Sequence, residues 1–164
     1  MQGHCQIIDK ALDYDVEGKR ILELGCGCLS NNYESENSPE SIYGPWMGRF
    51  MHSMKDGTGI EYIGVDCGGN TEEKFDYRRL DLLEPDALSR EFKEDYFDLV
   101  LAFMLFNSPE LAVRNGQKKE YYEYNWNADA KSAKGLADII MPQLERIAKP
   151  DGVFLWYGGD IDFE

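Results

Sequence analysis

The feature that most constrains the fold is a short apolar run that leads directly into a glycine-rich turn. The run covers residues 20–24 and is followed by Gly25, Cys26 and Gly27. An apolar run of this length, ended by a turn, is typical of a buried strand. The two glycines allow a ligand to approach the main chain closely, because they have no side chain in the way. A carboxylate, Glu23, stands near the end of this predicted strand.

A second predicted strand, residues 60–66, also ends on a carboxylate, Asp66. The carboxyl ends of neighbouring parallel strands meet at the same edge of a sheet, where α/β proteins bind their ligands. The sequence therefore predicts that Glu23 and Asp66 flank a nucleoside-binding crevice.

The rest of the chain alternates between strand-like and helix-like apolar periodicity, which is typical of an α/β sheet. The run at residues 97–105 is apolar enough for a central parallel strand buried on both faces. Right-handed crossovers then predict a doubly wound, mostly parallel sheet in a single domain, residues 1–164. Further strands are expected at 74–80 and 153–157, helices at 5–16, 45–54, 85–92 and 133–147, and a turn at 149–152.

Composition restricts the partners and the location of the protein. The 164 residues include 31 acidic and 17 basic side chains, for a net charge of −14. A field of this sign repels phosphate backbones and anionic lipids, so nucleic acid and membrane partners are disfavoured. A small molecule or a basic protein fits better. No signal-peptide pattern and no membrane-length apolar window are found, so we expect a cytoplasmic protein.

The cysteines raise the alternative of a zinc site at the predicted sheet edge. Cys26 and Cys28 are separated by one residue, whereas structural zinc sites usually space paired cysteines by two to four residues. Reduced thiols in a turn of small residues are the simpler interpretation, and we expect no metal site.

Five segments together resemble the class I S-adenosylmethionine-dependent methyltransferases, over roughly residues 18–157. The resemblance implies a Rossmann-like sheet of order 3-2-1-4-5 with helices on both faces, and S-adenosylmethionine as cofactor. Each segment is weakly specific alone, but all occur in the family's order. They are residues 23–27 (first motif), 64–66 (end of the second strand), 80–82 (third motif), 97–102 (fourth strand) and 144–152 (helix and turn before the fifth).

The resemblance implies roles for the residues of the first two segments. Glu23 would help to hold the methionine end of the cofactor, directly or through water. Gly25, Cys26 and Gly27 would offer close main-chain contact. Asp66 would accept hydrogen bonds from both ribose hydroxyls. The alternative is that Glu23 and Asp66 are ordinary solvated acids at strand ends.

The resemblance also implies roles for three residues further along the chain. Asp81 would accept a hydrogen bond from the adenine amino group, and Leu82 would lie beside the ring. Phe103, expected just past the fourth strand, would lie near the cofactor. For Asp81 the alternative is a cap on the helix that begins near Pro85. No catalytic residue is assigned, because methyl transfer to a strong nucleophile mainly requires positioning.

The chain departs from the family pattern in three places. Leu29 replaces a third glycine, residues 30–44 are longer than the usual link, and little sequence follows Tyr157. The family's C-terminal antiparallel strand pair is therefore expected to be absent. The fifth strand would then be an open edge, which a partner, a dimer or a missing C-terminal portion would cover.

Three functions are compared on this basis. The favoured function is methyl transfer from S-adenosylmethionine to a small molecule or a protein. The alternative is a non-catalytic S-adenosylmethionine-binding or scaffold subunit of the same fold, which Leu29 and the short C-terminus motivate. A nicotinamide-dependent oxidoreductase is weaker, since its Gly-x-Gly-x-x-Gly pattern would need glycine at Ser30.

Overall fold

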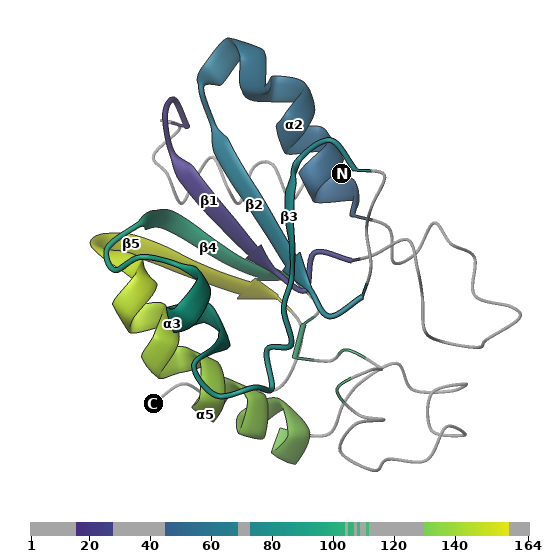
Figure 1. Ribbon diagram of the computed structural model, residues 1–164, viewed down its shortest axis with the longest axis vertical. Helices are drawn as coiled ribbons and strands as arrows, with labels where there is room; N and C mark the ends of the chain where they lie inside the picture. The colour runs from purple at the N-terminus through teal and green to yellow at the C-terminus, as the bar shows by residue number, and fades with distance from the viewer. Residues whose placement is uncertain are drawn as a thin grey trace, which may run out of the picture.

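A single parallel sheet forms the frame of the described structure (Figure 1). The computed structural model describes residues 16–27, 45–68, 73–103, 105–106, 108, 111 and 130–157. The strand order is β3-β2-β1-β4-β5, and every pairing is parallel. This confirms the predicted order and the Rossmann-like class. The strands are β1 (Arg20–Leu24), β2 (Glu61–Asp66), β3 (Asp76–Arg79), β4 (Phe97–Phe103) and β5 (Ala148–Tyr157).

Helices cover both faces of the sheet, as expected for a doubly wound fold (Figure 1). Helix α2 (Trp46–Thr58) lies on one face, and α3 (Ala87–Glu91) and α5 (Ala130–Ile147) lie on the other. The helix predicted at 45–54 is confirmed as part of α2, and its Met47 and Met51 are buried against the sheet. Each face therefore has its own apolar cluster.

Strands β1 and β4 lie in the middle of the sheet and are buried on both sides. Alternate residues of β1 serve opposite clusters, with Leu22 and Leu24 facing α5 and Ile21 facing α2. In β4 every residue except Asp98 is buried. Burial on both faces explains the continuous apolar pattern of this strand. The carboxyl ends of the central strands lie at one edge, which we call the carboxyl edge of the sheet.

Two predicted boundaries in the fourth and fifth strands are wrong. Strand β4 ends at Phe103, so this residue closes the strand rather than following it. Strand β5 begins at Ala148, although a turn is predicted at 149–152. Its register with β4 jumps from Ala148, opposite Phe97, to Val153, opposite Leu99. The residues predicted as a turn thus form an irregularity within β5, and their polar sequence gives no sign of the strand pairing.

The helix before α5 is also shorter than predicted. Helix α3 covers Ala87–Glu91 rather than residues 85–92, because residues 82–86 form turns. Several expectations lie outside the described residues: the helix at 5–16 except for its last residue, Leu29, the stretch 30–44 and everything after Tyr157. Among the helices that are described, none is long and apolar enough to cross a membrane.

The start of α3 is capped by a side chain from α5. Asp86 precedes the helix with a left-handed φ of 60° and makes no side-chain cap. Instead, Gln143 Oε1 accepts hydrogen bonds from the N–H groups of Leu88 at 2.8 Å and Ser89 at 3.3 Å. Gln143 Nε2 donates to the Ile139 carbonyl at 2.9 Å. Because Gln143 is 4% exposed, these bonds are shielded from water and fix α3 against α5.

Replacing Gln143→Met tests this cap. Methionine fills a similar volume but has no amide to accept from α3, so the buried N–H of Leu88 and the half-buried N–H of Ser89 lose their partner. We expect a loss of about 1–3 kcal/mol in the free energy of unfolding, measured by chemical denaturation. The exposed neighbour Glu145→Gln is the control and should change little. Equal stabilities for the Gln143 variant and the wild type would contradict the assignment.

Candidate functional site

The glycine turn after β1 is attached to the end of β2 by main-chain hydrogen bonds. The N–H groups of Gly25 and Cys26 both donate to the Val65 carbonyl, at 2.9 and 3.1 Å. Gly25 and Gly27 have left-handed φ angles of 68° and 88°. A Cβ atom on Gly25 would also lie 2.9 Å from Leu105 Cδ1. The turn therefore needs glycine at position 25 for its conformation and for the approach of Leu105.

Asp66, the last residue of β2, joins this turn to the loop that follows its own strand. Its Oδ2 atom accepts a hydrogen bond from Gly27 N at 3.0 Å. Its Oδ1 atom accepts from Gly68 N at 3.2 Å and from Cys67 Sγ at 3.6 Å. The half-buried carboxylate thus fixes the glycine turn and the loop after β2 relative to each other.

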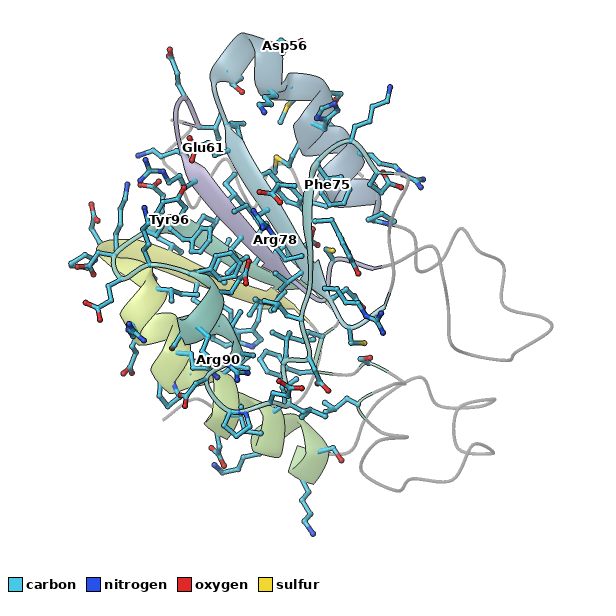
Figure 2. All side chains as sticks on the ribbon, viewed as in Figure 1. Asp56, Glu61, Phe75, Arg78, Arg90 and Tyr96 are labelled. Carbon is cyan, nitrogen blue, oxygen red and sulfur yellow. The ribbon has the colours of Figure 1, made fainter. Side chains whose placement is uncertain are left out.

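Strand β3 supports the loop after β2 from its other side. The Tyr77 hydroxyl donates to the Gly68 carbonyl at 2.7 Å, and Arg79 Nε donates to the Cys67 carbonyl at 3.1 Å. Phe75, which is labelled in Figure 2, lies just before β3. Its ring packs edge-on against Tyr62, with 5.4 Å between the ring centroids. The end of β2 is therefore held on both sides by neighbouring strands.

The hydrogen bonds of the turn determine what it can offer a ligand. The N–H groups of Gly25, Cys26 and Gly27 all donate to acceptors within the protein. The predicted main-chain contact of these residues must therefore come from carbonyl oxygens or Cα atoms. An anion such as phosphate requires free N–H donors at this position. The turn, as built, suits a ligand that donates hydrogen bonds.

Glu23 is buried rather than solvated, so the alternative of an ordinary exposed acid is wrong for this residue. Its side chain is 4% exposed, and the Tyr62 hydroxyl donates a hydrogen bond to its Oε2 atom. Burial raises the pKa of Glu23 from 4.5 to about 8. The bond from Tyr62 lowers this pKa, and the charge of Asp66 raises it. The two predicted acids are thus close enough to repel each other.

Asp81 lies near Asp66, because the N–H of the preceding Leu80 donates to the Asp66 carbonyl at 2.9 Å. Asp81 Oδ1 accepts from the N–H of Leu83 at 3.0 Å, which makes a local turn. The alternative interpretation of Asp81 as a helix cap is wrong, since α3 starts only at Ala87.

Leu82 and Phe103 belong to different apolar clusters. Leu82 is 7% exposed and packs with the cluster on the α3 and α5 face. Phe103 is 8% exposed and packs with the cluster on the α2 face. The structure therefore brings together Glu23, the glycine turn and Asp66, with Asp81 nearby, whereas these two apolar residues lie on opposite faces of the sheet.

Sequence reasoning missed two residues of the site, Tyr62 and Leu105. Period-2 alternation along β2 places Tyr62 on the same face as Asp66, which was a usable signal. Gly64 lies opposite Glu23 in the register, and a Cβ there would lie 2.8 Å from Cys26 Sγ. No local pattern indicated the contact of Leu105 with Gly25, because it depends on where the chain turns after β4.

The buried acid predicts an unusual pH dependence of stability. Between pH 4.5 and about 8 the native state holds a proton on Glu23 that the unfolded state has lost. Stability therefore falls as pH rises through this window. Glu23→Gln removes the titration, so its stability relative to wild type should rise from pH 5 to pH 8 by on the order of a few kcal/mol. Chemical denaturation at both pH values measures this, and a constant difference would contradict it.

Comparisons with known proteins find similar folds only. No protein-family model and no curated protein matches the sequence. A chain in the Haloferax volcanii complex containing the Trm112 methyltransferase activator has 19% identity and a TM-score of 0.43, over 94% of this chain and 52% of that chain. A Mesorhizobium loti S-adenosylmethionine-dependent methyltransferase has 18% sequence identity and a TM-score of 0.44, over 87% of this chain and 47% of that chain. YcgJ from Bacillus subtilis has 15% sequence identity and a TM-score of 0.46, over 95% of this chain and 50% of that chain.

This chain therefore spans about half the length of these solved structures. Identities and TM-scores at this level do not transfer a substrate or a partner. The class of the fold rests on the chain's own topology. Five parallel strands in the order β3-β2-β1-β4-β5, with helices on both faces, form the Rossmann-like fold expected from the class I methyltransferase resemblance.

Proposed function

We propose that this chain binds S-adenosylmethionine at the carboxyl edge of its sheet and transfers the methyl group to a small molecule or a protein. One observation carries the proposal. The N–H donors of the glycine turn are used within the protein, and one of them is bonded to the Asp66 carboxylate. The buried carboxyl group of Glu23 lies close enough for the charge of Asp66 to raise its pKa. The edge is therefore rich in acceptors and poor in donors.

This chemistry fits a nucleoside with a cationic substituent better than a dinucleotide. A ribose diol donates two hydrogen bonds, and a carboxylate accepts them. The amino group and sulfonium of S-adenosylmethionine are cationic and are favoured beside acidic groups. A pyrophosphate would instead meet carboxylates and a turn whose N–H groups are already bonded. The nicotinamide alternative is disfavoured on this ground and by Ser30.

Asp66 is the proposed ribose acceptor. A carboxylate has about four acceptor positions. Gly27 N and Gly68 N each use one, on different oxygens, with Cys67 Sγ also bonded to Oδ1. Oδ2 thus retains capacity for a ribose hydroxyl while it still holds the glycine turn. Binding through Asp66 would therefore tighten an arrangement that already exists.

The other roles follow the same edge. Glu23 would hold the methionine end, and Asp81 would accept from the adenine amino group. Leu82 beside the ring and Phe103 near the cofactor remain proposals, since both side chains are packed in the core. The cofactor supplies an electrophilic methyl group, and the residues of this chain would bind and orient it. No acid or base is assigned, because in-line positioning contributes most to such a displacement.

The acceptor and the partner are proposed from charge and topology. A net charge of −14 favours a basic protein or a small molecule as methyl acceptor. In the described sheet β5 forms one edge, where a dimer or a partner would pair. We place this activity in the cytoplasm.

Ligand binding tests the proposal directly. We expect S-adenosylmethionine and S-adenosylhomocysteine to raise the melting temperature of the folded chain and to give binding heats in calorimetry. Asp66→Asn should weaken both ligands at least about tenfold, because an amide group offers fewer acceptor positions and places a donor against the glycine N–H groups. Asp56→Asn, the same change on the exposed part of α2, is the matched control (Figure 2).

Two results would contradict the proposal. The first is a folded wild type that binds neither ligand at millimolar concentration. The second is Asp66→Asn binding as tightly as Asp56→Asn. Transfer of a radiolabelled methyl group into a cell lysate separates an enzyme from the non-catalytic alternative, because a binding subunit alone would form no product.

A further inference from the structure

The buried pair of Glu23 and Tyr62 indicates how the candidate site would respond to a charged ligand. We propose that Glu23 is an uncharged acid in the ligand-free protein and ionises when the cationic amino group of the cofactor binds beside it. We further propose that Tyr62 is the positioning residue that aims this carboxyl group and lowers the cost of its ionisation. This inference rests on the proposed function. It adds that Glu23 releases its proton to solvent when the ligand binds.

The geometry of the pair supports an uncharged Glu23. Glu23 is 4% exposed and Tyr62 is 7% exposed. The Tyr62 hydroxyl donates to Glu23 Oε2, and it is the one hydrogen bond found for this carboxyl group among the described residues. A buried carboxylate with a single neutral donor is poorly stabilised, so it takes up a proton instead.

The elements around Glu23 supply no compensating cation in the described part of the chain. On the β4 side its register partner is Leu101, and α2 covers this face with Met47 and Met51. On the β2 side the charge of Asp66 opposes the ionisation of Glu23. Arg49, in the first turn of α2, is exposed, and its Nε donates to Glu73 Oε1 at 2.8 Å.

Cys26 is the remaining titratable group near the pair. It lies in the glycine turn after β1, and as a thiolate it would disfavour the ionised Tyr62. Tyr62 therefore stays a hydroxyl donor, because burial and the nearby Glu23 raise its pKa well above the ordinary value. The acid of the pair that can titrate in the working range is Glu23, whose pKa is raised to about 8.

A ligand ammonium group would supply the missing cation. Its charge favours the ionised carboxylate, and the bond from Tyr62 to that carboxylate is then charge-assisted and stronger. The proton released by Glu23 goes to solvent. Affinity for a ligand with an amino group should consequently rise with pH while Glu23 is protonated in the free protein, by up to about tenfold per pH unit.

Calorimetry with two ligands tests this coupling. S-adenosylhomocysteine contains the cationic amino group of its amino-acid end. 5′-Methylthioadenosine has the same nucleoside and a thioether but lacks the amino-acid end. We expect wild-type affinity for S-adenosylhomocysteine to increase between pH 6 and about 7.5, with up to one proton released per ligand. Proton release is measured by repeating the titration in buffers of different ionisation enthalpy. Affinity for 5′-methylthioadenosine should stay nearly constant.

Two variants assign the effect to the pair. Glu23→Gln should bind S-adenosylhomocysteine without pH dependence and without proton release. Tyr62→Phe should keep the pH dependence but move its midpoint to higher pH, because the bond that lowers the pKa of Glu23 is lost. A purely structural role for Tyr62 would reduce stability without moving this midpoint.

The outcomes separate this inference from the proposed function. Binding of S-adenosylhomocysteine with constant affinity and no proton release would overturn the inference and leave the proposed function standing. Failure of the folded wild type to bind either cofactor form at any pH would overturn both. A Glu23→Gln variant that keeps the wild-type pH dependence would overturn the assignment to Glu23.

Discussion

The attachment of the glycine turn to the end of β2 is the interaction on which the candidate site depends. Two N–H groups of the turn donate to the Val65 carbonyl, and the third donates to the Asp66 carboxylate. This arrangement requires left-handed glycines, parallel pairing of β1 with β2, and a carboxylate as the last residue of β2. It also uses the donors of the turn, so the edge presents acceptors to a ligand.

The carboxyl edge has a cost in stability that the rest of the fold offsets. Glu23 is buried near Asp66, no cation lies beside it among the described residues, and its raised pKa measures that cost. Two apolar clusters on opposite faces, and capping contacts such as Gln143 at α3, hold the sheet in place around it. An unfavourable buried acid that persists beside a ligand edge is typical of a functional site.

The sequence predicted the sheet well because its signals are local. The strand at 20–24, the apolar run of β4 and the helix at 45–54 each follow from periodicity. The strand order follows from the resemblance to the class I methyltransferases. The β5 start was missed because Pro150 and Gly152 read as a turn, whereas pairing with Phe97 extends the strand. That pairing is a long-range property that no local pattern contains.

The sequence predicted that Glu23 and Asp66 meet at the carboxyl edge, but not the chemistry of these residues. Glu23 and Asp66 do approach each other, yet the burial of Glu23 depends on Tyr62, Leu101 and α2, which come from three other elements. Likewise, the use of the turn's N–H groups depends on how β2 ends beside it. Motif spacing identifies which residues meet, whereas only the packed structure determines their charge and free hydrogen-bonding groups.

A crystal structure of this chain with S-adenosylhomocysteine tests the central claim most directly. We expect ribose hydroxyls within hydrogen-bonding distance of the Asp66 carboxylate, while the Gly27 N–H remains bonded to the same side chain. Ligand density at another edge of the sheet, or a bound ligand whose ribose does not touch Asp66, would contradict it.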